Sequence, residues 1–153
     1  MRGNSLDMTL LNGYVGYALR RAQGAAFADF NMRLAGLPLR SGQFAVLVLI
    51  DQNPGASQSS ISAALGIQKA NFVATIADLE HRGLVRRRKS PTDGRSYSLG
   101  LTSAGASLLR AAIRLQAQHE AHVIAQIGAA ERQQLLKLLH ELARLPRAAE
   151  GAT

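Results

Sequence analysis

The sequence predicts a mainly α-helical fold that carries one small β-hairpin. Apolar residues recur at helical spacing through most of the chain, which predicts helices. Residues 84–101 (LVRRRKSPTDGRSYSLGL) differ, because apolar and small side chains alternate after a Pro-Thr-Asp-Gly turn. A period of two indicates a strand with one buried face. A hairpin this small is not stable alone in water, so we expect it to pack on neighbouring helices.

The hairpin turn is indicated by Pro91, Asp93 and Gly94. Proline fixes φ, aspartate bonds to its own backbone, and glycine tolerates positive φ. After the turn, Tyr97, Leu99 and Leu101 are expected on the buried face. The first arm begins with two apolar residues and then becomes cationic. The basic residues of the hairpin are Arg86, Arg87, Arg88, Lys89 and Arg95.

The predicted helices are separated by residues that begin or end helices. Ser41, Ser57 and Thr102 can cap helices, and Gly66 can end one. The expected helices run from Tyr14 to about Leu34, from Ser41 to the Asn53-Pro54-Gly55 break, from Ser57 to Gly66, from near Gln68 to His81 or Arg82, from Thr102 to near Gly128, and from Ala129 or Ala130 to Pro146.

Each short helix in the middle of the chain has a predicted inner face. The residues expected to be buried are Phe44, Leu47, Val48 and Ile50 in the second helix, Ile61, Ala64 and Leu65 in the third, and Phe72, Val73, Ile76 and Leu79 in the fourth. The third and fourth helices are joined by a tight turn that contains glycine, and the basic hairpin follows. This order predicts a winged helix-turn-helix.

The outer side of the fourth helix is expected to be small, polar and nearly neutral. It is formed by Gln68, Lys69, Asn71, Thr75 and Asp78. Such a surface suits a DNA major groove, where Gln and Asn can pair with adenine and Lys with guanine or phosphate. The alternative is an ordinary solvated helix face.

Composition limits the function classes. A chain of 153 residues with 47% hydrophobic residues can bury one core, so we expect one domain. The absence of cysteine excludes disulfides, thiolate metal sites and cysteine nucleophiles, and it fits a reducing cytosol. We see no signal peptide and no run of about eighteen apolar residues. The expected protein is soluble and cytoplasmic, without a membrane partner.

The charge balance favours a polyanionic partner. The formal net charge is +8 and the isoelectric point is about 11.0. The partner could be nucleic acid or acidic lipid, and the clustering of charge in the hairpin favours nucleic acid. No Gly-rich phosphate loop, HExxH or GxSxG motif occurs, and no carboxylate pair stands out. We therefore expect neither an enzyme nor a cofactor.

His119 and His122 are the only candidates for metal ligands. They are spaced i, i+3 on a helix, with Glu120 on another face. Two nitrogens do not make a site, because zinc prefers at least three protein ligands. We expect solvent-exposed histidines and no metal.

The segment from Gly55 to Gly105 resembles the MarR family of bacterial transcriptional regulators. The resemblance lies in QSSISAALGI and in LEHRGLVRRRKSPTDGRSYSLGLTSAG, where an Asp93-Gly94-Arg95 wing signature stands between GLVRR and an LTxxG motif. It implies that Arg95 enters a DNA minor groove and that Asp93 helps to hold it. A narrow A·T-rich minor groove concentrates negative potential and attracts arginine, so this role is physically reasonable.

One departure from the family affects base reading. The family often has Thr-Arg in the middle of the recognition helix, where this chain has Val73 and Ala74. On a strand the arginines at 86–88 alternate, so which of them face DNA stays open. The expected DNA contacts are Ser57, Gln58, Gln68, Lys69, Asn71, Thr75, Arg87, Lys89, Asp93 and Arg95.

The resemblance also implies a two-fold dimer formed by the ends of the chain. Residues 10–37 and 103–146 would form the dimerisation region, and residues 41–101 the DNA-binding region, within one chain of residues 1–153. The last helix carries Leu135, Leu138, Leu139, Leu142 and Leu145 on one stripe, which could be core or dimer interface. Two recognition helices about one DNA turn apart would read a palindrome.

A small-molecule effector is the third partner that the resemblance implies, often a phenolic compound, an aromatic acid or its CoA thioester. It would bind between the dimer helices and the DNA-binding lobe. The candidate contacts are Tyr14, Tyr17, Phe27, Phe30 and Phe44 with Arg20, Arg21 or Arg40. The alternative is that these aromatic residues are core and the arginines are solvated.

The sequence therefore predicts a homodimeric repressor that binds double-stranded DNA and is released by an effector. Two alternatives stay open. One is an architectural nucleic-acid-binding protein that does not respond to a ligand. The other is a winged-helix module that binds protein.

Overall fold

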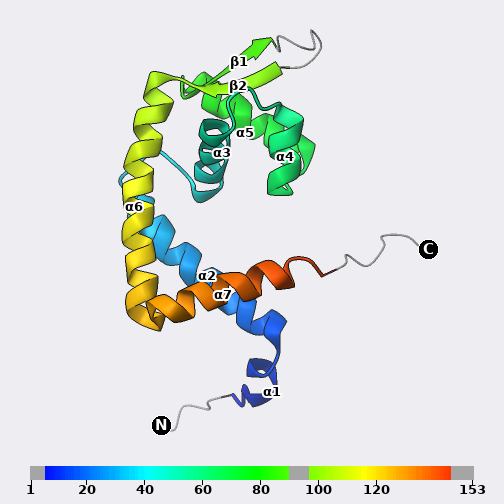
Figure 1. The fold of residues 1–153 in the computed structure, drawn as a ribbon, viewed down its shortest axis with the longest axis vertical. Coiled ribbons are helices and arrows are strands. Elements are labelled where there is room, and N and C mark those ends of the chain that lie inside the picture. Colours follow the sequence, from blue (N-terminus) through cyan, green and yellow to red (C-terminus); the bar gives the residue numbers. More distant parts are fainter. Residues whose placement is uncertain (1–5, 90–96, 146–153) are drawn as a thin grey trace, which may run out of the picture. The chain divides into compact units, whose positions relative to one another are not determined.

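The computed structural model describes residues 6–89 and 97–145, and the chain divides into two compact units, Met1–Gln116 and Ala117–Thr153. The mainly helical fold with one hairpin is confirmed (Figure 1). The elements are α1 (Thr9–Asn12), α2 (Val15–Leu34), α3 (Ser41–Gln52), α4 (Gln58–Leu65), α5 (Lys69–His81), β1 (Val85–Lys89), β2 (Tyr97–Leu101), α6 (Ser103–Ile127) and α7 (Ala129–Leu142).

The winged helix-turn-helix is built around one core in the first unit. β1 and β2 pair antiparallel, and α3, α4 and α5 gather on one side of this hairpin (Figure 1). The backbone before α4 extends the pairing, because Leu99 N–H donates to the Ala56 carbonyl at 3.0 Å. The largest fully buried side chains are Leu34, Val46, Leu47, Ile50, Phe72, Ile76 and Leu79.

The turn between α4 and α5 has the predicted start and stop residues. Ser57 Oγ accepts a hydrogen bond from Ser60 N–H at 3.1 Å and caps α4. Gly66 ends the helix in the left-handed region, with φ of 63°. The prediction for Ser41 is wrong, because Arg40 is the N-cap and Gln43 Oε1 accepts from its N–H at 3.2 Å. Ser41 is the first residue inside α3.

The start of α6 is fixed against the base of the hairpin. Thr102 Oγ1 donates to the Gly83 carbonyl at 2.6 Å and accepts from Gly105 N–H at 3.0 Å, so the predicted cap is confirmed. A Cβ added at Gly105 would lie 2.0 Å from the Leu84 carbonyl oxygen. The Thr and Gly of the LTSAG segment therefore allow two backbones to meet where no other side chain fits.

Several predicted inner faces need correction. In α3, Val46 is buried and was missing from the prediction, whereas Phe44 and Val48 are half-buried and pack against the core as predicted. In α4, Ala64 is exposed and Ser62 is buried in its place. Ser62 can be buried because its hydroxyl donates a hydrogen bond to the Ser59 carbonyl and needs no water. The short helix α1 was not predicted, since four residues carry no helical periodicity.

Helix α2 leaves most of its apolar side chains exposed in the single chain. Its fully buried residues are Phe30 and Leu34. Tyr14, Val15 and Phe27 are 55%, 63% and 47% exposed. The predicted helix is confirmed, yet much of its apolar surface has no cover within the described part of one chain.

The second unit contains the end of α6 and all of α7. An ion pair joins the two helices, with Arg132 Nε donating to Glu120 Oε2 at 2.6 Å. The leucine stripe of α7 is only partly covered. Leu139 and Leu142 are half-buried, whereas Leu135, Leu136 and Leu138 are exposed. No helix among the described residues is both long and apolar enough to cross a membrane.

Candidate nucleic-acid interface

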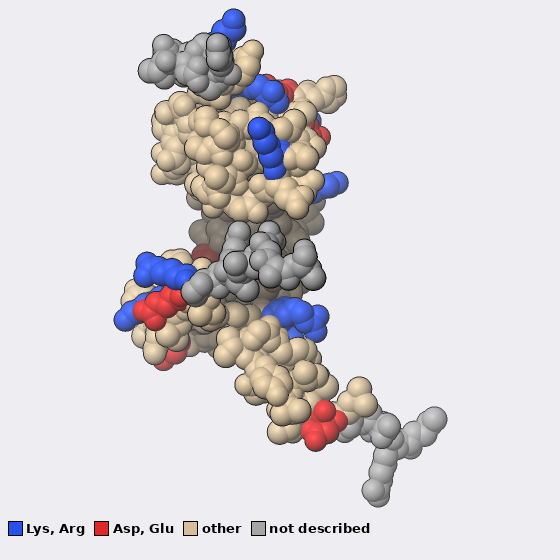
Figure 2. All heavy atoms as spheres, turned by 90° about the vertical axis from the view of Figure 1, so that its right-hand side faces the viewer, with Lys and Arg blue, Asp and Glu red and all other residues tan. Residues whose placement is uncertain are grey.

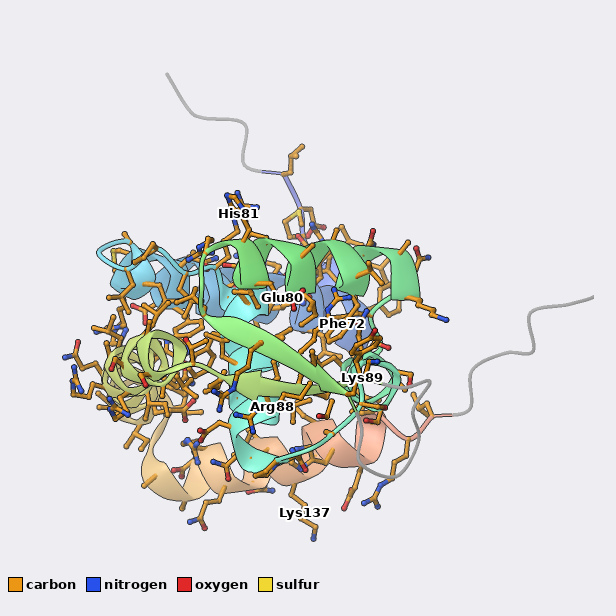
Figure 3. All side chains as sticks on the ribbon, turned by 90° about the horizontal axis from the view of Figure 1, so that it is seen from above. Phe72, Glu80, His81, Arg88, Lys89 and Lys137 are labelled. Atoms are coloured by element: carbon orange, nitrogen blue, oxygen red, sulfur yellow. The ribbon has the colours of Figure 1, made fainter. Side chains whose placement is uncertain are left out.

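The orientation of α5 about its own axis decides which residues it offers to a partner. Phe72, Ile76 and Leu79 are completely buried and form its inner stripe. Phe72 and Glu80 extend from the side of α5 that faces the hairpin, and His81 extends from the opposite side (Figure 3). The outward face is therefore the one that ends at His81.

This outward face is apolar and small, which corrects the prediction of a polar surface. Val73 is 40% exposed rather than buried. It lies about 100° around the helix from Phe72, outside the stripe that the larger side chains define. The exposed residues at i, i+3, i+4 and i+7 are Ala70, Val73, Ala74 and Ala77.

The predicted polar residues of α5 lie at the edges of this face. Lys69 and Asn71 are exposed, and Gln68 is the exposed N-cap. Thr75 is half-buried, and its hydroxyl donates to the Asn71 carbonyl at 3.0 Å. Because that donor bonds to its own helix, the Thr75 hydroxyl is less available to a base than predicted.

Asp78 belongs to a network that holds α5 against α3. Gln43 Nε2 donates to Asp78 Oδ2 at 2.9 Å, and Arg82 Nη1 donates to the same oxygen at 3.1 Å. Arg82 also donates to the Pro38 carbonyl. Asp78 is therefore a positioning residue on the side of α5 toward α3.

A small groove brings together three of the predicted DNA contacts. Ser57 and Gln58 at the start of α4 and Lys69 at the start of α5 line a groove of about 210 Å³. Tyr97 of β2 lines it too, and its side chain is 49% exposed instead of buried as predicted. Tyr97 is the first residue of β2 and lies beyond the core that covers Leu99. The alternation along the strand therefore predicted burial at a position that the core does not reach.

The basic strand β1 does not present all of its charges alike. Arg87 lies opposite the buried Leu99, and its Nε is 2.8 Å from Glu80 Oε2. Arg86 and Arg88 lie opposite Gly100 and Ser98, on the other face of the hairpin. Lys89 is exposed opposite Tyr97. Arg87 is thus bound within the molecule, while the predicted Asp93 and Arg95 lie outside the described residues.

The upper part of Figure 2 shows isolated basic side chains among mostly uncharged ones, with acidic side chains close to some of them. No continuous basic patch is visible in the upper part of this view. The basic side chains on this face therefore lie apart from one another and leave uncharged surface between them. A surface of this kind can contact phosphates at its rim and base edges at its centre.

The predicted effector residues divide into two groups. Tyr14, Tyr17, Arg20 and Phe27 belong to α2 or its N-cap, and the Arg20 guanidinium lies 5.4 Å from the centre of the Tyr17 ring. Phe44 packs edge-on against Phe30, with ring centres 5.3 Å apart. Arg40 lines a separate groove of about 660 Å³ with Gln43, Ala74, Asp78 and Arg82.

The two histidines do not share one environment. His119 is 8% exposed, so the prediction of a solvent-exposed side chain is wrong for it, whereas His122 is exposed as predicted. Within the described ranges, no three His, Cys, Asp or Glu side chains are grouped so that they could hold a metal ion.

Comparison with known proteins places this geometry in a family. The sequence model of the MarR family matches residues 35–96. A protein of Thauera aromatica, a transcriptional regulatory protein for the hcr operon, is 34% identical over 133 residues, which are 86% of this chain and 80% of the relative.

Solved structures agree with this match. The transcriptional repressor CouR bound to a 23-mer DNA duplex is 43% identical, with a TM-score of 0.88, over 92% of this chain and 99% of CouR. CouR bound to p-coumaroyl-CoA is 40% identical, with a TM-score of 0.84, over 93% and 100% of the two chains. These relatives are transcriptional regulators and not enzymes. The chain belongs to the MarR family and is a DNA-binding transcriptional regulator.

Proposed function

We propose that this protein is a homodimeric repressor in the cytoplasm that binds a palindromic operator and leaves it when an aromatic effector binds. The main support is the reading surface: an exposed helix face of small side chains, with Lys69 at its start and the basic hairpin beside it. A major groove about 12 Å wide admits a helix of this kind. Lys89, Arg88 and Arg86 would contact phosphates, and Arg95 would enter the minor groove with Asp93 beside it.

The remaining predicted DNA contacts keep supporting roles in this proposal. Ser57, Gln58 and Lys69, which line one groove, would contact the backbone of one half-site. Gln68 and Asn71 would reach base edges from the border of the reading face. Arg87 has its charge compensated by Glu80, so we rank it below its neighbours in the strand.

The dimer would cover the apolar surface that one chain leaves exposed. α1 and α2 expose Leu10, Val15 and Phe27, and α7 exposes Leu135 and Leu138. Apolar surface on this scale is typical of a partner interface. Residues 10–37 and 103–146 would therefore form the dimerisation region, and residues 41–101 the DNA-binding region, as predicted.

The effector would be a phenolic compound, an aromatic acid or, in closest agreement with the relatives, an aromatic acyl-CoA thioester. CouR was solved with p-coumaroyl-CoA and with DNA, at similar identity to this chain. Tyr14, Tyr17, Phe27 and Phe44 would supply aromatic surface, and Arg20 and Arg40 would meet anionic groups. Effector binding would favour a dimer whose half-site spacing no longer matches the operator.

Selection from random duplexes tests the DNA-binding proposal. The expected result is one enriched palindrome whose half-sites are about one helical turn apart. Binding to every duplex alike would indicate an architectural protein, and no salt-sensitive binding would indicate a protein-interaction module. Either result contradicts the repressor.

Titration of the protein–operator complex tests the effector. p-Coumaroyl-CoA should lower operator affinity at least tenfold, since coupling free energies are typically about 1–3 kcal/mol. Free CoA and p-coumarate are the controls for the two halves of the molecule. If none of a panel of aromatic acids and their thioesters changes affinity, the effector class is wrong.

A further inference from the structure

The composition of the outward face of α5 is unusual for a surface that approaches DNA. Ala70, Val73, Ala74 and Ala77 are all exposed, and none of them can form a side-chain hydrogen bond. Val73 is the largest and is 40% exposed. Valine has lower helix propensity than alanine, so an exposed valine at this position does not serve the helix itself.

The position of Val73 around α5 shows which part of the outward face is near the hairpin. Val73 precedes Glu80 by two helical turns, so it lies at the edge of the outward face that is nearer the hairpin. Glu80 is bound to Arg87 of β1 and holds that side of α5 beside the hairpin. Val73 is consequently the apolar side chain of this face that a major groove beside the hairpin would meet first, and Ala74 lies next to it on the same face, toward α3.

The chemistry of the major groove supplies one apolar partner. Each base pair exposes donors and acceptors there, and thymine alone adds a C5-methyl group, which apolar side chains contact. Guanine is usually read by Arg or Lys. Neither residue type occurs among Ala70, Val73, Ala74 and Ala77, and the nearest lysine, Lys69, is the first residue of the helix. Alanines also permit close approach of the helix backbone to the bases.

We propose that Val73 and Ala74 are specificity-determining residues that recognise thymine methyl groups, so each half-site carries thymines beneath α5. This inference rests on the proposed function, in which α5 enters the major groove. It adds burial of methyl groups to the hydrogen bonds by which the polar residues at the edges of the helix would read bases.

Replacement of single thymines by deoxyuridine in the selected operator tests the inference. The change removes only the C5-methyl group and keeps every hydrogen-bonding atom. The wild-type protein should lose about fourfold in affinity at each position beneath α5, which corresponds to the burial of one methyl or methylene group. Thymines outside the contacted half-sites provide the control.

Val73→Ala identifies the residue responsible. This variant should bind the thymine operator about fourfold more weakly and should no longer distinguish thymine from deoxyuridine at one position. Its fold is not at risk, because alanine favours helices and no core contact of Val73 is lost. Arg88→Ala is the matched control, which should weaken binding to both duplexes equally and keep their ratio.

The outcomes separate this inference from the proposed function. A palindrome in which every deoxyuridine duplex binds like the thymine duplex overturns the inference and leaves the repressor intact. The second outcome is that Val73→Ala and Ala74→Ser both keep the wild-type ratio of affinities for the thymine and deoxyuridine duplexes. That result assigns the preference for thymine to other residues and also overturns the inference. A selection that enriches no sequence overturns both.

Discussion

The DNA-binding region and the flanking helices differ in how far their apolar side chains are buried within one chain. In the winged helix-turn-helix, Phe72, Ile76 and Leu79 are completely buried within one chain. In α2 and α7, Phe27 and Leu138 remain 47% and 52% exposed. The first region can hold its shape by its own packing, whereas the flanking helices would be covered by a second chain in the proposed dimer. Fold stability and assembly should therefore respond to different substitutions.

The largest expected difference is between two phenylalanines. Phe72→Ala should lower the free energy of unfolding by about 3–5 kcal/mol, because it opens a cavity in the core. Phe27→Ala should change dimer dissociation far more than it changes the stability of the DNA-binding region. Chemical denaturation and sedimentation equilibrium separate the two effects. An equal loss of stability in both variants would contradict the comparison.

Assembly can be disrupted selectively on α7. Leu138→Glu should weaken the dimer by at least about 2 kcal/mol, since it would place a charge in the proposed interface of each protomer, where the exposed leucine would otherwise be covered. The circular dichroism spectrum should stay helical while operator affinity falls. Lys137→Gln, next along the helix, is the matched charge control, because it lowers the net charge by the same one unit. Should Leu138→Glu remain a dimer at nanomolar concentration, α7 does not form the interface.

A substitution at the junction between the hairpin and α6 should have a smaller effect on stability. Gly105→Ala should destabilise the protein by about 1–3 kcal/mol, because its Cβ would overlap the Leu84 carbonyl. Gly42→Ala, where a Cβ meets nothing within 4 Å, is the control and should be neutral or slightly stabilising. Thermal unfolding of the two variants measures the difference. Equal melting temperatures would mean that the junction relaxes.

The smallest effect separates two neighbouring arginines. Arg88→Ala should reduce the slope of log affinity against log salt concentration by about one, which corresponds to one released counterion. Arg87→Ala should reduce this slope less, because Glu80 already compensates the charge of Arg87. Affinities measured between about 50 and 200 mM salt give both slopes. Identical slopes would show that the Glu80–Arg87 pair opens on DNA.

The fold could be predicted because its boundaries are set by local chemistry. Ser57, Gly66 and Thr102 act within one or two helical turns of themselves, and all three were located correctly. The rotation of α5 was harder. Its alanines carry no signal for inside or outside, so the apolar pattern groups Val73 with the larger apolar residues, whereas the packing of Phe72 leaves Val73 at the surface.

The candidate site depended more on tertiary structure. The composition of β1 indicates a basic strand, yet only the packing of α5 shows that Arg87 meets Glu80. Tyr97 followed a strand pattern but lies past the end of the core, so its alternation did not indicate burial. Pairing across elements and the extent of a core are properties of the folded chain, which periodicity does not contain.

The contact between Gly105 and Leu84 has a mechanical consequence. Two backbones in direct contact leave no side chain to bend or slide between them, and the Thr102 hydroxyl bonds to both sides of the same junction. The base of the hairpin and the first turn of α6 are therefore held together at their backbones. A tilt at the start of α6 would move the base of the hairpin with it.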